Sequence, residues 1–257
     1  MKKLKKNLGG KSSGQLLIVA ALSIAVLISS TTIYVYEVSR ETNSIKNNSI
    51  SDFVLAVKQS TRNAMISSLV NASNGGERTV LTDNLNSFSQ ALRSLYQFGT
   101  CQLNFTVLND VGYDSGMRFS WNDSGLGISS AYADFTLKIY GVTSNTVVNY
   151  AVNVTTTLTV NGSYTIVENE EKLVNLTCKI YNEGEPALAK NMTVFYENLG
   201  SWVPVNSSNS LSITDYHNGT YNISFTVNTS SSSVQVSVHA YDSRSVLVQT
   251  NTTCNEA

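Results

Sequence analysis

Residues 221–227 read YNISFTV, and the architecture of the chain is best predicted outward from this stretch. Tyr221, Ile223 and Phe225 alternate with Asn222 and Ser224, so an extended strand would bury one face and expose the other. Similar stretches, separated by short turns, recur through the last hundred residues without any helical period between them. The pattern predicts an antiparallel β-sandwich over residues 161–257. The expected strands cover residues 173–181, 192–196, 210–213, 221–227, 234–241 and 246–252.

Two turns of this region carry a family resemblance. Residues 215–221, DYHNGTY, resemble the D-x-G-x-Y turn that precedes a late strand of immunoglobulin-like domains, with two extra residues between Asp215 and Gly219. Residues 182–186, NEGEP, resemble the early hairpin turn of the same domains. Ile223 stands where antibody domains have Cys, so the likeness is to the wider group of surface immunoglobulin-like repeats. The resemblance covers roughly residues 160–254 and implies a spacer or an adhesive module.

A second β region is expected over residues 100–160. Leu103 and Phe105 alternate with polar neighbours, as do Phe135 and Leu137, which is typical of half-buried strands. The same alternation of apolar and polar residues continues from Val148 to about residue 158. A strand of this length can connect two β units without a linker. We place a boundary near residue 160, and the pattern leaves open whether residues 101–160 form a separate domain or one layer of a larger sandwich.

Residues 15–36 read QLLIVAALSIAVLISSTTIYVY and contain no ionisable charge before Glu37. As a helix this segment would span roughly 33 Å, which is enough to cross a bilayer. The preceding residues 1–14 form a basic leader with five lysines, whereas only Arg40 follows soon after the span. The positive-inside rule therefore predicts a single-pass protein in the cell membrane, with a cytoplasmic N-terminus and the bulk of the chain extracellular.

Residues 11–18, KSSGQLLI, resemble the class III signal of archaeal type IV pilin-like proteins. In that family a short basic leader is cut just before the apolar helix, which here places the cleavage candidate between Gly14 and Gln15. Two positions depart from the family: Ser13 precedes Gly14 where a basic residue is usual, and Val19 stands where many pilins have Glu. These departures favour an uncut membrane anchor over a processed filament subunit.

Residues 37–99 are expected to form a helical neck or hairpin. Apolar residues recur at intervals of three and four from Ile50 to Leu69, and again from Leu81 to Tyr96, with Asn74-Gly75-Gly76 as the turn. Thr82 or Asp83 is the expected cap of the second helix. The two helices can bury each other, or the first can continue the membrane helix as the stems of pilins do.

Neutral polar residues replace charge in this chain. Only 14% of residues are charged, against roughly 25% in an average domain, while there are 36 Ser, 25 Thr and 28 Asn. Thirteen Asn-x-Ser/Thr sequons occur, where random order would give roughly 7. In several strands the sequon Asn lies on the face opposite to the apolar residues. A sugar can be attached only to an Asn that faces outward in this way. We therefore predict N-glycosylation at Asn104, Asn153, Asn175, Asn222 and Asn251.

The three cysteines allow one intrachain disulfide. Cys178 is expected on the same inward face of a strand as Val174 and Leu176, and Cys254 on the same inward face as Val248. Outside the cytoplasm a Cys178–Cys254 bridge is permitted, and it would stabilise the fold by about 4 to 5 kcal/mol in the chain-entropy model. Cys101 is then the odd thiol, which can stay buried, pair with a second chain or replace one partner in that bridge.

The sequence contains no recognisable catalytic motif, so we do not expect an enzyme, a cofactor or a metal site. Asp215 with His217, or Asp110 with Asp114, could bind a cation weakly, but solvated turns use such residues routinely. A net charge of −1 argues against nucleic-acid binding. The expected partners are the lipid bilayer, N-glycans and other surface proteins or further copies of the chain.

The function best predicted is that of a membrane-anchored cell-surface structural or adhesive protein. The alternatives are a pilin-like subunit of a surface filament and an extracellular ligand-binding module of a membrane complex. A concave aromatic site would favour the ligand-binding module. Its candidate residues are Trp121, Trp202, Tyr196 and Tyr216.

Overall fold

The computed structural model describes residue 24 and residues 27–32, 49–96, 99–110, 112–141 and 145–257. The chain divides into two compact units, Met1–Val57 and Lys58–Ala257, and each is described by itself. In the first unit, Ile24 and residues 27–32 are helical. The hydroxyls of Ser30 and Thr32 donate to carbonyls one turn back, at 3.0 and 2.6 Å.

No helix among the described residues is both long enough and apolar enough to cross a bilayer. Most of the predicted span over residues 15–36 lies outside the described residues, as does the cleavage candidate at Gly14 and Gln15. The membrane anchor and the processing site therefore stay predictions.

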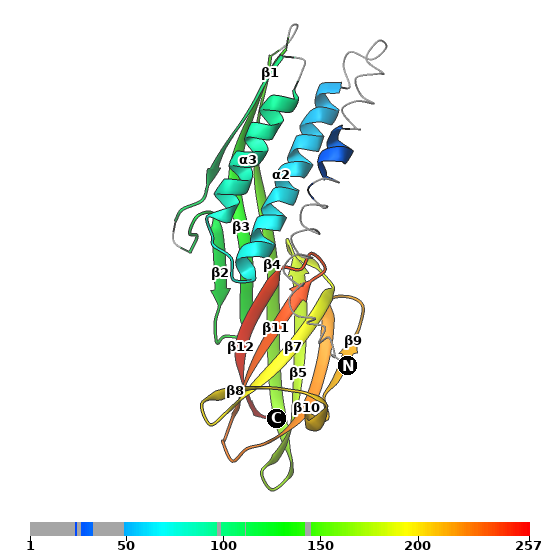
Figure 1. The fold of residues 1–257 in the computed structure, drawn as a ribbon. Helices are drawn as coiled ribbons and strands as arrows, with labels where there is room; N and C mark the ends of the chain where they lie inside the picture. The colour runs from blue at the N-terminus through cyan, green and yellow to red at the C-terminus, as the bar shows by residue number, and fades with distance from the viewer. Residues whose placement is uncertain (1–23, 25–26, 33–48, 97–98, 111, 142–144) are drawn as a thin grey trace, which may run out of the picture. The chain divides into compact units, whose positions relative to one another are not determined.

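Two helices, α2 (Ser49–Ser73) and α3 (Val80–Leu95), form an antiparallel hairpin (Figure 1). The amide of Asn84 donates to the hydroxyl of Ser68 across the helix pair at 2.8 Å. Gly75 makes the turn after α2 with a φ of +96°, which a residue with a Cβ adopts poorly.

The predicted cap of α3 was wrong, because the helix begins earlier than the apolar pattern indicated. Thr79 is the N-cap, and Thr82 and Asp83 lie inside the first turn. The backbone turns before Leu81, where the predicted apolar pattern starts, since the amide of Val80 already donates to the carbonyl of Glu77 at 3.3 Å. Within that first turn the Asp83 carboxylate interacts favourably with the helix dipole.

Helix α3 and the part of α2 from Lys58 on cover one face of a β region in the second unit. Its strands are β1 (Gly99–Val107), β2 (Met117–Trp121), β3 (Leu126–Gly141) and β4 (Asn145–Glu168). β1 and β2 both pair with β3, which also pairs with β4. Leu103, Phe135 and Leu137 are buried, as their alternation predicted. The hydroxyl of Ser89 on α3 donates to the carbonyl of Leu103 at 2.7 Å and holds the helix to the sheet.

β4 runs through the region near residue 160 without a break. Its residues 145–159 pair with β3, and its residues 156–168 pair with β5 (Glu171–Asn182). The two β regions expected from the sequence therefore share one long strand.

The protein is mostly β-strand, and its sheet curls over on itself. The main path of strands runs β8-β7-β11-β12-β4-β5-β10-β9. A parallel pairing of Asn255 with Ser163 connects β12 to β4. The core cluster lies between the two halves of this path and includes Val174, Phe225 and Val238. The remaining elements are β6 (Glu185–Pro186), β7 (Ala189–Asn198), β8 (Ser201–Pro204), the 3-10 turn η1 (Ser207–Asn209), β9 (Ser212–Asp215), β10 (Thr220–Asn228), β11 (Val234–Asp242) and β12 (Leu247–Glu256).

Gly162 allows the close approach of β4 and β12. A Cβ at this position would lie 2.8 Å from the sulfur of Cys254 and would also overlap Leu176. The approach depends on the missing side chain, because real Cβ atoms do not come this close to their neighbours.

Candidate functional site

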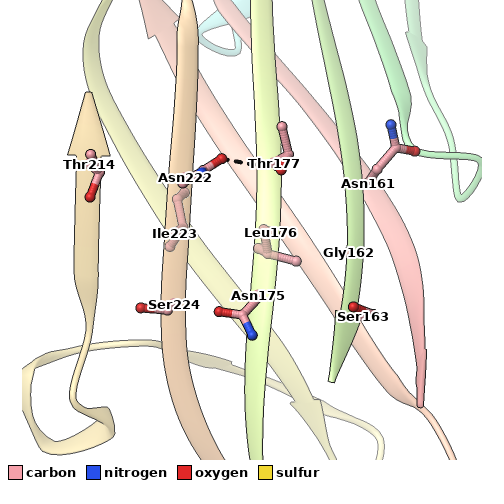
Figure 2. Close-up of a pocket in the computed structure, with 10 residues that line it drawn as sticks. All are labelled: Asn161, Gly162, Ser163, Asn175, Leu176, Thr177, Thr214, Asn222, Ile223 and Ser224. Atoms are coloured by element: carbon pink, nitrogen blue, oxygen red, sulfur yellow. Dashed lines mark hydrogen bonds between the residues drawn. The ribbon is translucent and has the colours of Figure 1, made fainter. Parts of the chain in front are cut away.

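A shallow hollow of about 470 Å³ lies over the outward face of β4, β5, β10 and β9 (Figure 2). Seven neutral polar side chains form its floor. We call this surface the polar shelf, and it consists of Asn161, Ser163, Asn175, Thr177, Thr214, Asn222 and Ser224. None of the residues that line the hollow is charged, so the shelf itself offers a charged ligand no ion pair.

The strand register arranges the polar shelf in two rows. In the first row Thr177 is paired with Asn161 on one side and with Asn222 on the other. In the second row Asn175 is paired in the same way with Ser163 and Ser224. Neighbouring strands are about 4.8 Å apart, so amide and hydroxyl groups recur at that interval across the sheet.

Hydrogen bonds order the first row. The hydroxyl of Thr177 donates to Oδ1 of Asn222 at 3.2 Å, and Nδ2 of Asn222 donates to the hydroxyl of Tyr216 at 2.9 Å. Figure 2 shows the first of these bonds. Tyr216, a residue that is 52% exposed, lies at the end of this chain of bonds. The row thus combines fixed polar groups with an exposed aromatic residue.

The polar shelf contains three complete sequons, which begin at Asn161, Asn175 and Asn222. Side chains two residues apart in a strand share a face, so each sequon exposes its Asn and its hydroxyl residue together. The predicted sites Asn175 and Asn222 are both exposed.

The other predicted sugar sites differ in their surroundings. Asn104 on β1 and Asn153 on β4 are exposed, and each uses its Oδ1 to accept a hydrogen bond, from Gln102 and from Ser130. Asn251 is half-buried, and its Nδ2 donates to Asp123 at 2.8 Å. Since a sugar is attached at Nδ2, this bond competes with modification of Asn251, as the Tyr216 bond does at Asn222.

All three cysteines are buried with free thiols. Cys178 and Cys254 belong to the same core cluster, in agreement with their inward parity. Burial raises the pKa of Cys178 to about 12, with the nearby Cys254 adding to the shift, and burial raises those of Cys101 and Cys254 to about 11. As free thiols, the three cysteines are protonated at neutral pH. Cys178 and Cys254 are not bonded to each other in this structure, and their disulfide stays a prediction.

The two histidines lie on different elements, and among the described residues only His217 has a turn aspartate beside it. His239 packs against Phe195, with 4.8 Å between ring centroids, and burial lowers its pKa. His217 is exposed in a turn, with Nδ1 3.5 Å from a carboxylate oxygen of Asp215. Asp114 accepts a hydrogen bond from Arg78 at 3.1 Å. No group of three metal-binding side chains occurs among the described residues.

The four aromatic candidates do not converge. Trp121 donates to the hydroxyl of Ser129 at 3.1 Å, and Tyr196 packs against the core. Trp202 lies on the edge strand β8, whereas Tyr216 follows β9 at the other end of the strand path. Tyr216 alone lies beside the polar shelf.

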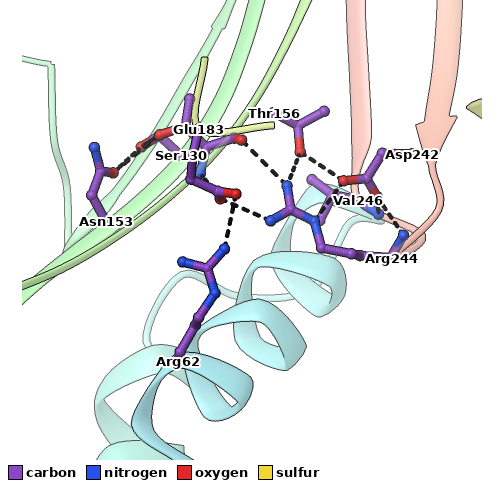
Figure 3. A network of polar contacts seen from close by, with 9 residues as sticks. Arg62, Ser130, Asn153, Thr156, Glu183, Asp242, Arg244 and Val246 are labelled. Carbon is purple, nitrogen blue, oxygen red and sulfur yellow. Dashed lines mark hydrogen bonds and ion pairs between the residues drawn. The ribbon is translucent and has the colours of Figure 1, made fainter. Parts of the chain in front are cut away.

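An ionic network around Arg244, in which Asp242 is the only fully buried charged residue, was not expected from the sequence. Arg244 follows β11 and donates to Asp242 at 2.7 Å, to Glu183 at 2.8 Å and to the hydroxyl of Thr156 at 2.9 Å (Figure 3). Arg62 of α2 donates to the other oxygen of Glu183 at 2.9 Å. The network joins α2 to two loops of the β region.

The charges of this network lower the pKa of the Glu183 carboxyl group. Burial alone would raise the pKa of Glu183, but the hydrogen bonds from Arg244 and the Thr155 amide, with the charges of Arg244 and Arg62, outweigh it and lower the pKa. Glu183 therefore stays ionised below the ordinary carboxyl range. No local pattern could reveal this, because the partners lie 61 and 121 residues from Glu183.

No known protein family and no curated protein matches this chain. Its function therefore has to be inferred from its own residues.

Proposed function

We propose that this chain is a membrane-anchored cell-surface protein, structural or adhesive in role, that displays an N-glycosylated β module. The observation that carries this proposal is the position of the strand sequons. Asn104, Asn153 and Asn175 are exposed on strands whose opposite faces are buried. A coat of neutral sugar on these faces accounts for the scarcity of charged residues in the extracellular part of the chain.

The strand order supports an immunoglobulin-like assignment of residues 161–257. The half-path β4-β5-β10-β9 corresponds to strands A-B-E-D of such a sandwich, and β8-β7-β11-β12 corresponds to C′-C-F-G. Domains of this kind serve as spacers and adhesive modules, but the fold alone does not choose between the two.

Intact-mass measurement of the chain, exported from an archaeal host that glycosylates sequons, tests the sugar coat. We expect a mass increment that is lost stepwise in Asn104→Gln, Asn153→Gln and Asn175→Gln. The matched control is Asn149→Gln, because Asn149 is an exposed strand residue of β4 outside any sequon. A wild-type chain with its unmodified mass would refute the glycosylated surface.

N-terminal sequencing and membrane extraction test the anchor. We expect the mature chain to retain its leader and to leave the membrane fraction only in detergent. An intact leader on a chain that is released by a salt or alkaline wash would refute the single-pass anchor.

A pilin-like subunit is the second candidate. The 25-residue helix α2 follows the apolar segment and, from Lys58 on, belongs to the same compact unit as the sheet. A stem helix attached to a β module in this way suits a filament subunit. A mature chain that begins at Gln15 would favour this candidate over the uncut anchor.

A further inference from the structure

We propose that the polar shelf binds a neutral carbohydrate. This inference rests on the proposed surface role and deepens its adhesive form, since it names the class of ligand. The sugar can come from the chain's own glycan at a neighbouring Asn or from a separate surface glycan. Both sources present the same chemistry, namely uncharged rings with hydroxyl groups.

The chemistry of the floor favours a sugar. Asn amides supply donors and acceptors, and Ser and Thr hydroxyls supply both in one group, which is what sugar hydroxyls require. Charged ligands would find no counter-charge among the residues that line the hollow. An apolar ligand would strip water from the amides and hydroxyls of the floor without replacing their hydrogen bonds.

Several polar groups of the floor remain available to a ligand. Among the described residues, the side chains of Asn161, Asn175 and Ser224 make no hydrogen bond to another protein group. In contrast, Thr177 and Asn222 are oriented by their bonds to each other and to Tyr216. Because Thr177 and Asn222 are already held in place, a ligand that binds to them costs less side-chain entropy.

The shape of the site is also suitable. A hollow of about 470 Å³ falls within the usual range for small-ligand sites, roughly 300–1,000 Å³. The exposed ring of Tyr216 offers an apolar face beside the polar floor, on which the C–H face of a sugar ring can pack. The floor is built on strands rather than loops, so its spacing is rigid.

The test uses the full-length protein in detergent, produced in a host without N-glycosylation, on an array of neutral and acidic oligosaccharides. We expect binding to neutral members, weakened about tenfold or more in the double variant Thr177→Val/Ser224→Ala, since hydrogen bonds to the ligand are lost. Thr136→Val is the matched control, because Thr136 is a half-buried strand Thr that donates to Oδ1 of Asn149 at 2.9 Å, outside the shelf. This control should bind like wild type.

Absence of binding to every neutral oligosaccharide would overturn the proposal. Equal binding by the shelf variant and wild type would overturn it as well. Because this protein carries no sugar, the outcome is independent of whether the chain is glycosylated in its own host.

A second arm identifies the source of the sugar. Protein from a glycosylating host is applied to the same array before and after removal of its glycans. Binding that increases on removal assigns the shelf to the chain's own sugar, and unchanged binding assigns it to a separate glycan. Either result supports the shelf, whereas binding that disappears on removal would mean that the attached sugars were responsible and would overturn it.

Discussion

Replacement of Arg244 by Met should destabilise the fold far more than the loss of an ordinary surface arginine. The Asp242 side chain is 0% exposed, and Arg244 supplies its only cationic contact among the described residues. Removal of one partner from a buried ion pair costs about 3–5 kcal/mol, because it leaves an uncompensated charge. The amides of Arg244 and Val246 and the hydroxyl of Thr156 still donate to Asp242, so we expect the lower end, about 3 kcal/mol.

The assay is urea unfolding of the full-length protein in detergent, followed by tryptophan fluorescence. Urea is preferred over guanidinium because it is uncharged and does not screen ion pairs. The matched control is Arg78→Met, since Arg78 and Asp114 are paired at 3.1 Å with side chains 41% and 68% exposed. That exposed pair should contribute about 0–1 kcal/mol.

A double variant separates the charge from the packing. Asp242→Asn in the Arg244→Met background removes the unpaired charge and should restore much of the lost stability. If Arg244→Met costs no more than Arg78→Met, or if the double variant is less stable than Arg244→Met alone, the reasoning is refuted.

Three further predictions concern acid, packing and thiols. The pKa of Glu183 is lower in the folded chain than its ordinary value of 4.5. The ionised Glu183 therefore stabilises the fold fully at a pH above 4.5, and this contribution is lost as the pH falls through the lower pKa of the folded state. The thermal midpoint should fall with pH below about 4.5, and less steeply for Glu183→Gln; identical pH profiles would contradict this. Gly162→Ala should cost about 1–3 kcal/mol in urea unfolding, because its Cβ would overlap Leu176 and Cys254, and wild-type stability would argue against the close approach of β4 and β12. The predicted Cys178–Cys254 disulfide is tested by exporting the protein, unfolding it without a reductant and adding a thiol reagent. The reagent should label only Cys101, whereas three labelled thiols would rule out any disulfide.

Much of the β architecture could be predicted from local pattern. Alternation in residues 221–227 predicted the strand β10, its buried Ile223 and its exposed Asn222, because side chains of a strand point to opposite faces in turn. The same rule found the exposed Asn104 and the buried Cys178. The edge strand β8 was missed, since its four residues are too short to show a period.

What the sequence determined by itself is therefore local: which residues alternate, which Asn residues face outward and where the chain can turn. Only the tertiary structure decided what those residues meet. The first row of the polar shelf exists because strand pairing places Asn161, Thr177 and Asn222 side by side. The Arg244 network exists because loops and a helix far apart in the chain converge there. Periodicity reports the face on which a side chain lies, whereas its neighbours depend on register and packing, which are set by contacts distant in the sequence.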